Sequence, residues 1–199
     1  MPEPLYTHVR KRVALTKGEY DRCRTFFIPK KIRKKQFLLQ EGEVCTHLAF
    51  VLKGCLRSYT VDRGGEEHIV QFATEDWWIS DLQSFLSGNP SAYTIDALED
   101  SEVLLLEKKA REPLLSEVPK FERFFRLLLE ANYVASHRRI EETLSISAEE
   151  RYLAFTKTYP ALVQRIPQNQ IASYLGVTPQ SLSRIRNELA KREKSVTAG

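Results

Sequence analysis

IPQNQIASYLGVTPQSLSRIRNELAKR, residues 166–192, is the stretch that decides how the C-terminal part of this chain folds. Ile171, Ala172 and Leu175 recur at a spacing that puts them on one face of a helix, so this face should be buried. Gly176 follows at once, where a helix needs a residue that can adopt a positive φ in order to end. The first half of the stretch therefore predicts a short helix followed by a tight turn.

The second half of the stretch predicts another helix. Thr178 can N-cap it, and Pro179 suits its first turn. Leu182, Ile185 and Leu189 recur at i, i+3 and i+7, so they should face inward. The remaining side carries amide, hydroxyl and guanidinium groups, which can read base edges in a major groove. The pattern predicts a helix-turn-helix with these candidate DNA-contacting residues: Thr178, Gln180, Ser181, Arg184, Arg186 and Lys191.

Charge separates this reading from the alternative, an αα-hairpin that merely packs into a core. Residues 151–199 hold eight Lys or Arg and two Asp or Glu. Residues 1–150 hold 22 basic and 24 acidic residues, and within them the run 30–35 is itself strongly basic. Positive charge is therefore concentrated at the C-terminal end, where DNA phosphates would be met, and double-stranded DNA is the expected partner.

The composition is that of a globular protein with room for one large domain or two small ones. The chain has 199 residues, of which 42% are hydrophobic and 28% charged. No apolar run approaches the length of a membrane span, and the start lacks a signal-peptide core, so we expect a cytoplasmic protein with no membrane partner. Cys23, Cys45 and Cys55 lack ligand spacing and are expected to be buried free thiols.

The N-terminal two thirds predict a helix and then an antiparallel β-structure. Residues 4–28 have helical character, with a capping box at Thr16 and Glu19 and a stop at Pro29. Short β-rich segments follow without intervening helices, separated by glycine turns. They are Phe37–Leu39, His47–Leu52, Leu56–Val61, His68–Phe72, Ser91–Leu98 and Glu102–Glu107. This spacing favours a small barrel or jelly roll, and with the helices an α+β fold.

A long helix is predicted from residue 119 to 144. Its stripe could pack on its own domain, but a mixture of Phe, Leu, Asn and Ala also suits a self-complementary helix pair, and we favour a homodimer. The interface residues expected on this basis are Phe121, Phe124, Phe125, Leu128, Asn132 and Ala135. Three segments result: a sensor domain (1–118), a dimerisation helix (119–145) and a DNA-binding domain (146–199).

In the order barrel, long helix and helix-turn-helix, the chain resembles regulators of the cyclic-AMP receptor/FNR (CRP/FNR) family. The residues that carry this resemblance are Gln40–Glu43, the strand-turn FVLKGCLR over 50–57, the loop 62–67 and the segment 71–81. The resemblance implies a cyclic-nucleotide-binding-like barrel and a DNA-binding homodimer, with RNA polymerase as a further partner. The family usually continues into a β-hairpin wing, but only residues 193–199 follow here, so we expect a short or absent wing.

The resemblance also locates a ligand cassette, which departs from the family pattern. Members that bind cyclic AMP carry a phosphate cassette that resembles F-x-G-E-L followed by R-S/T-A. Its arginine neutralises the phosphate. Here Ser80 replaces the glycine, Asp81 the glutamate and Ser91 the arginine, and no Lys or Arg occurs between Arg63 and Lys108. We expect no cyclic AMP binding, and a pocket open to a less anionic effector. The pocket residues are Trp78, Ser80, Asp81, Leu82, Ser91, Ala92 and Tyr93.

No cofactor, metal or catalytic residue is expected. The iron–sulfur branch of the family carries a cysteine cluster that Cys23 alone cannot supply, and the four histidines show no haem or metal pattern. An enzyme on a similar barrel would need converging histidines, and His47 and His68 stand alone on different strands. The alternative to a DNA-binding regulator is a small-molecule sensor or interaction module with a vestigial helix-turn-helix.

Overall fold

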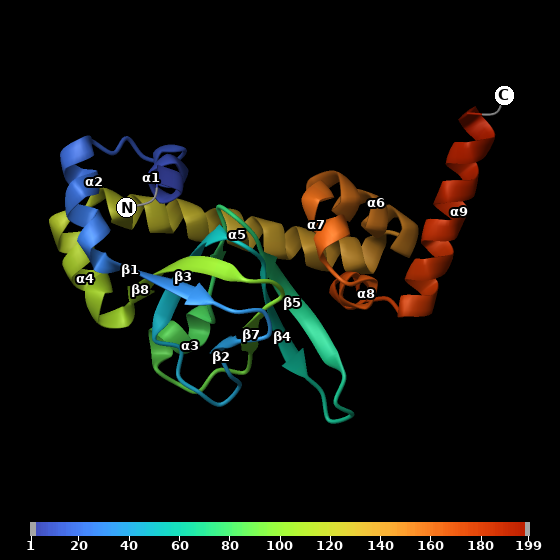
Figure 1. Ribbon diagram of the computed structural model, residues 1–199, viewed down its shortest axis with the longest axis horizontal. Coiled ribbons are helices and arrows are strands. Elements are labelled where there is room, and N and C mark those ends of the chain that lie inside the picture. The colour runs from blue at the N-terminus through green and yellow to red at the C-terminus, as the bar shows by residue number, and fades with distance from the viewer. Residues whose placement is uncertain (1–2, 198–199) are drawn as a thin grey trace. The chain divides into compact units, whose positions relative to one another are not determined.

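The computed structural model describes residues 3–197, and the side chains of 4–192. The chain forms two compact units, Met1–Asn132 and Tyr133–Gly199, which meet within one long helix (Figure 1). The three segments predicted from the sequence have their boundaries near the two ends of that helix, whereas the two units divide within it. Among the described residues, no helix is both long and apolar enough to cross a bilayer.

The first unit is built on two four-stranded antiparallel sheets. One has the strand order β1-β8-β3-β6 and the other β2-β7-β4-β5. The strands are β1 (Phe27–Ile32), β2 (Phe37–Leu39), β3 (His47–Lys53), β4 (Leu56–Val61), β5 (Glu67–Ala73), β6 (Trp78–Ile79), β7 (Thr94–Ala97) and β8 (Ser101–Glu107). Each of the six predicted β-segments coincides with or overlaps a strand, and the predicted jelly-roll type of fold is confirmed.

The N-terminal helical prediction is correct only in part. Helices α1 (Glu3–Arg10) and α2 (Lys17–Cys23) form, and the predicted capping box of Thr16 and Glu19 is present. A 3-10 turn, η1 (Arg24–Phe26), then leads into β1, where a helix had been expected to residue 28. Pro29 does not interrupt this strand, because β1 is the edge of its sheet and an edge strand tolerates a missing N–H.

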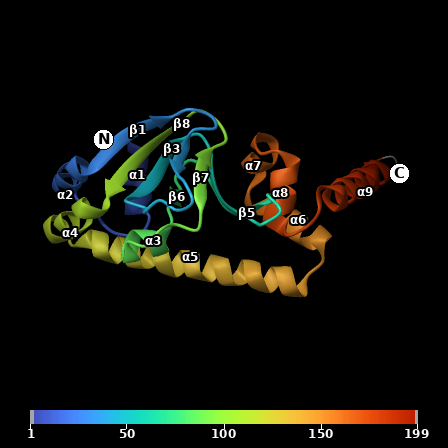
Figure 2. The same cartoon turned by 90° about the horizontal axis from the view of Figure 1, so that it is seen from below.

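Helices α3 (Leu82–Ser87), α4 (Lys108–Glu117) and the start of α5 (Lys120–Ser145) complete this unit (Figure 2). The fully buried side chains include Phe50 of β3, Leu114 of α4, and Phe121 and Phe124 of α5. The prediction that Phe121, Phe124 and Phe125 form a dimer interface is therefore wrong. Their rings pack against one another and on the core of their own unit, with centroids 5.4–5.9 Å apart.

The second unit is helical and begins with the end of α5. Helix α6 (Ala148–Thr158) starts at a capping box formed by Ser147 and Glu150, and α7 (Pro160–Arg165) follows it. Helices α8 (Gln168–Leu175) and α9 (Pro179–Thr197) form the predicted pair. Residues 193–197, placed beyond the recognition helix in the sequence prediction, continue α9.

Candidate functional site

The turn between α8 and α9 has the geometry that the sequence predicts. Gly176 takes a φ of 67°, in the left-handed region that favours glycine. The N–H of Val177 donates to the carbonyl of Ala172 at 3.0 Å, which closes the end of α8. The hydroxyl of Thr178 accepts a hydrogen bond from the N–H of Ser181 at 3.1 Å and so caps α9.

Burial then decides which side of α9 remains available. Leu182 and Ile185 are buried, as are Ile171 and Leu175 of α8, so the inward face is the predicted one. The opposite side is open and slightly concave, and we call it the exposed α9 face. It consists of Pro179, Gln180, Ser183, Arg184, Asn187, Glu188 and Lys191.

Three predicted DNA-contacting residues lie on this face and three lie elsewhere. Gln180, Arg184 and Lys191 are on it. At 100° per residue, Arg186 points about 140° away from the centre of these three residues. Ser181 is half-buried and bonded to Thr178, at the cap. Because i+3 and i+7 from Gln180 are Ser183 and Asn187, helical spacing alone could have added these two residues.

The guanidinium of Arg184 is available for a partner. Its side chain is exposed, and within the part of the chain that the structure describes it makes no ion pair with Glu188. Arg192, by contrast, donates to Oε1 of Glu149 on α6 at 2.5 Å. Of these two arginines, Arg184 is therefore the one presented outward by its helix.

The predicted ligand cassette surrounds the start of α3, and its polar groups bond to one another. Asp81 N-caps α3, with Oδ1 accepting from the N–H of Ser84 at 3.0 Å, and Oδ2 accepts from the hydroxyl of Ser91 at 2.7 Å. The Ser84 hydroxyl accepts from the N–H of Cys45 at 2.9 Å. Asp81, Ser84 and Ser91 are each at most 5% exposed, so these groups are already satisfied in a closed network.

The buried arginine of the roll is also fully engaged. Arg57 of β4 donates to both oxygens of Asp96 on β7, at 2.7 and 3.0 Å, and to the carboxylate of Glu67 on β5. Burial alone would lower the pKa of Arg57, but the two carboxylates raise it above its ordinary value. Its charge is neutralised within the sheet and is not free for a phosphate.

A cavity of about 170 Å³ lies among β3, β5, β6 and the helices α3, α4 and α5 of the first unit, and we call it the α3–α5 cavity. Its lining residues are Leu48, Gln71, Trp78, Ile79, Ser80, Leu82, Phe85, Leu86, Arg111, Phe125, Leu128, Leu129 and Asn132. Three predicted pocket residues, Trp78, Ser80 and Leu82, line it. The other four, Asp81, Ser91, Ala92 and Tyr93, do not. Arg111 was missed, because it reaches the cavity from α4 and is distant in the sequence.

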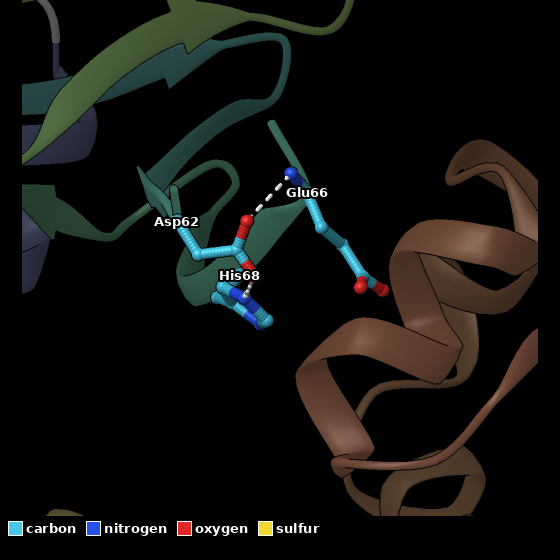
Figure 3. A group of neighbouring side chains, drawn as sticks. All are labelled: Asp62, Glu66 and His68. Atoms are coloured by element: carbon cyan, nitrogen blue, oxygen red, sulfur yellow. Dashed lines mark hydrogen bonds and ion pairs between the residues drawn. The ribbon is translucent and has the colours of Figure 1, made fainter. Parts of the chain in front are cut away.

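One cluster of potential metal ligands is explained by a hairpin turn. Asp62, Glu66 and His68 are exposed at the β4–β5 connection (Figure 3). Asp62 Oδ1 accepts from the N–H of Gly64 and of Glu66 at 2.8 and 3.0 Å, and Oδ2 bonds to His68 at 2.9 Å. These bonds fix the turn, and nothing further points to an ion there.

A jelly roll, a long helix and a helix-turn-helix unit together define a class of two-part regulators. Comparisons of this chain with known proteins point to the same class. Residues 29–117 match the family described as cyclic nucleotide-binding domain. The fumarate and nitrate reduction regulatory protein of Vibrio cholerae is 25% identical over 193 residues, covering 90% of this chain and 76% of that protein. The anaerobic regulatory protein of Haemophilus influenzae is 25% identical over 175 residues, covering 81% of this chain and 66% of that protein.

Solved structures show the same fold. FixK2 from Bradyrhizobium japonicum superposes with a TM-score of 0.70 at 18% identity, over 84% of this chain and 86% of that one. The matched domain, the related regulators and the shared architecture agree with the motifs noted in the sequence. Residues 29–117 thus match a cyclic nucleotide-binding domain, and the chain as a whole is similar in sequence and fold to regulators of the CRP/FNR type.

Proposed function

We propose that this protein is a transcription regulator that binds double-stranded DNA as a homodimer. The observation that carries the proposal is the exposed α9 face. Gln180 and Arg184 lie one turn apart on it, on a helix fixed by a capped turn and a buried apolar side. An amide can bond an adenine edge and a guanidinium a guanine edge, each through two hydrogen bonds.

The charge distribution and the relatives support DNA as the partner. Eight basic against two acidic residues lie in 151–199. The V. cholerae and H. influenzae relatives are named as regulatory proteins, and neither name denotes an enzyme. A regulator rather than a catalyst is therefore proposed, acting in the cytoplasm where bacterial DNA is reached. RNA polymerase remains a predicted further partner.

The proposed dimer interface lies on a different stripe of α5 from the one expected from the sequence. Leu129, Tyr133, Ile140 and Leu144 are exposed by 44%, 65%, 56% and 81%. Their spacings of four, seven and four residues put them on one side, rotated by about 120° from the predicted stripe. Apolar side chains in such a row suit a second copy of the same helix, and a two-fold pair would present two α9 helices to two half-sites.

Selection of bound sequences from random DNA tests the proposal. The full chain should enrich a two-fold symmetric site with half-sites about 34 Å apart. Retention on the selected site should fall steeply as salt rises, since phosphate contacts release counterions. If no sequence is enriched and retention is absent at low salt, the helix-turn-helix is vestigial and the alternative of a sensor or interaction module applies.

A further inference from the structure

We propose that the α3–α5 cavity binds a compact organic acid with an apolar body, of the aromatic carboxylate class. The cavity lies wholly within the first unit, and its lining contains nine apolar or aromatic residues and four polar ones. Neither the domain match nor the relatives assign it a ligand of this kind. Two independent properties of the cavity point to this chemistry: its size and the charge on its wall.

Size limits the ligand to about the dimensions of a substituted benzene. The cavity volume is about 170 Å³. An apolar cavity of roughly 150 Å³ accommodates benzene, whereas sites for larger ligands generally have about 300 Å³ or more. A cyclic nucleotide is therefore too large for this cavity, and a single ring with a small substituent fits it. Phe85, Phe125 and Leu128 supply the apolar walls.

One buried donor of a lining residue, the indole N–H of Trp78, does not open on the cavity. The indole Nε1–H of Trp78 is buried and has no hydrogen-bond partner among the described residues. Two neighbouring polar groups are satisfied: Gln71 donates to the carbonyl of Trp78 at 2.8 Å, and Ser80 donates to the carbonyl of His47 at 3.1 Å. The Nε1 atom has less than 1 Å² of accessible surface, so it does not open on the cavity and supplies no donor to a ligand there.

The charge on the cavity wall identifies the ligand as an acid. Arg111 is the sole charged residue that lines the cavity within the described part of the chain, and its side chain is 33% exposed. It pairs with Glu112, whose side chain is 76% exposed, so this ion pair is weak and leaves most of the guanidinium N–H groups available. The side-chain amide of Asn132 makes no hydrogen bond within the described residues. A carboxylate in the cavity can accept from the guanidinium of Arg111.

The position of the cavity gives binding a route to regulation. Leu128, Leu129 and Asn132 line it from α5, and Leu129 also begins the exposed stripe of that helix. A ligand there contacts both α3 and the helix proposed to pair in the dimer. Ligand binding itself stands apart from DNA binding, whereas a regulatory effect rests on the proposed function.

Calorimetric titration of the full chain without DNA tests the proposal. Benzoate and 4-methylbenzoate are the probes, and benzyl alcohol is the uncharged comparison. Both acids should bind, and benzyl alcohol should bind about tenfold more weakly, since it lacks the charge that pairs with Arg111. Trp78→Phe keeps an aromatic side chain on the wall and removes only an N–H that does not open on the cavity, so benzoate should bind this variant within about twofold of the wild type. Arg111→Gln should erase the preference for the acid.

The matched control is Trp77→Phe, at the other tryptophan of the chain, which does not line the cavity. This variant should bind benzoate like the wild type, and the thermal melting of each variant verifies its fold. The proposal is overturned if neither acid binds, if benzyl alcohol binds as tightly as benzoate, or if Arg111→Gln retains wild-type affinity. DNA retention, measured in parallel without acid, shows whether the proposed function stands regardless.

Discussion

The hydroxyl of Ser91 donates a hydrogen bond to Oδ2 of Asp81 at 2.7 Å, and the two side chains are 3% and 5% exposed. By the sequence resemblance, a cyclic-nucleotide cassette would have an arginine at the position of Ser91 and a glutamate at the position of Asp81. Here the two side chains bond to each other and Asp81 caps α3, so both are already engaged in a structural contact.

We therefore predict that cyclic AMP does not bind. A missing phosphate arginine removes a charge-assisted hydrogen bond of roughly 1.5–3 kcal/mol, which is a factor of about 10 to 150 in affinity. The buried Arg57 cannot replace it without releasing Asp96 and Glu67. Titration calorimetry with cyclic AMP should show no saturable heat. A low-micromolar dissociation constant would contradict this interpretation of Ser80, Asp81 and Ser91.

We predict that Ile140→Glu converts the dimer to a monomer. Ile140 lies in the exposed stripe of α5 and is 56% exposed in the isolated chain. Two glutamates facing each other across a two-fold seam would repel and bury charge. Light scattering at micromolar concentration gives the mass directly.

The matched control is Ala135→Glu, an exposed position on the originally predicted stripe. This variant should remain dimeric. If Ala135→Glu dissociates the protein while Ile140→Glu does not, the original stripe forms the seam. A wild-type protein that is monomeric under these conditions would remove the dimer proposal altogether.

The parts that could be predicted from sequence are those governed by local signals. Gly176 and Thr178 define the turn by their own backbone and side-chain chemistry, and both have the expected roles. The dimer interface predicted from the α5 stripe was wrong at its phenylalanines for a different reason. Periodicity shows that Phe121 and Phe124 share a face, but not whether the same chain or a second copy covers it.

The ligand site shows the same limit. Asp81 and Ser91 could be located along the chain, but their mutual hydrogen bond requires the fold. Arg111 and Asn132 meet Trp78 at one cavity only because α4 and α5 pack against the roll. A search for a basic residue near the cassette in sequence therefore could not find Arg111.

We predict that His8 makes the protein less stable in acid. His8 is 6% exposed and lies between the rings of Phe50 and Phe124. Burial, with a smaller contribution from Arg12, lowers the pKa of His8 from 6.5 to about 4. Its Nε2 faces Nη1 of Arg12 at 3.4 Å, and because a guanidinium can only donate, this nitrogen acts as the acceptor.

The unfolded chain takes up a proton at His8 near pH 6.5, whereas the folded chain resists it until about pH 4. The contribution of neutral His8 is therefore complete above pH 6.5 and is lost progressively as pH falls towards 4, by at most about 1.4 kcal/mol per pH unit. Urea unfolding at pH 7 and pH 5 measures this loss. The difference between the two pH values should be smaller in His8→Gln, and an equal difference would contradict the assignment.

We predict that Arg151→Met loosens the helix-turn-helix. From α6, Arg151 donates to the carbonyl of Leu175 at 3.1 Å and to that of Ile146 at 2.8 Å, so it ties the end of α8 to the segment after α5. Hydrogen bonds from a charged donor contribute roughly 1.5–3 kcal/mol each. Amide exchange in α8 should accelerate at least about tenfold, while exchange in β3 stays unchanged.

Arg192→Met is the control for this variant. Arg192 also reaches α6, through Glu149, but its side chain is 63% exposed, and such an ion pair contributes about 0–1 kcal/mol. Its effect on α8 exchange should be small. Equal acceleration in both variants would show that loss of any arginine, rather than of the carbonyl contacts, loosens the unit.

We predict that Arg184 and Arg186 have different roles on DNA, because α9 turns them to different sides. Arg184 lies on the exposed α9 face beside Gln180, and Arg186 does not. Arg184→Ala should cost about 1–3 kcal/mol on the selected site and relax the preference at one base pair of each half-site. Arg186→Ala should leave base preference unchanged and lower affinity for all sequences alike, with a shallower salt slope, if it meets a phosphate.

Binding of both variants to the selected site and to single-base-pair variants of it, over a range of salt concentrations, separates these roles. Asn187→Ala adds a further check, because Asn187 shares the face of Arg184 and should alter preference at a neighbouring base pair. An Arg184→Ala protein with wild-type affinity and wild-type base preference would show that the exposed α9 face does not read bases. A specificity change from Arg186→Ala alone would mean that α9 meets the groove with a different side from the one its burial leaves open.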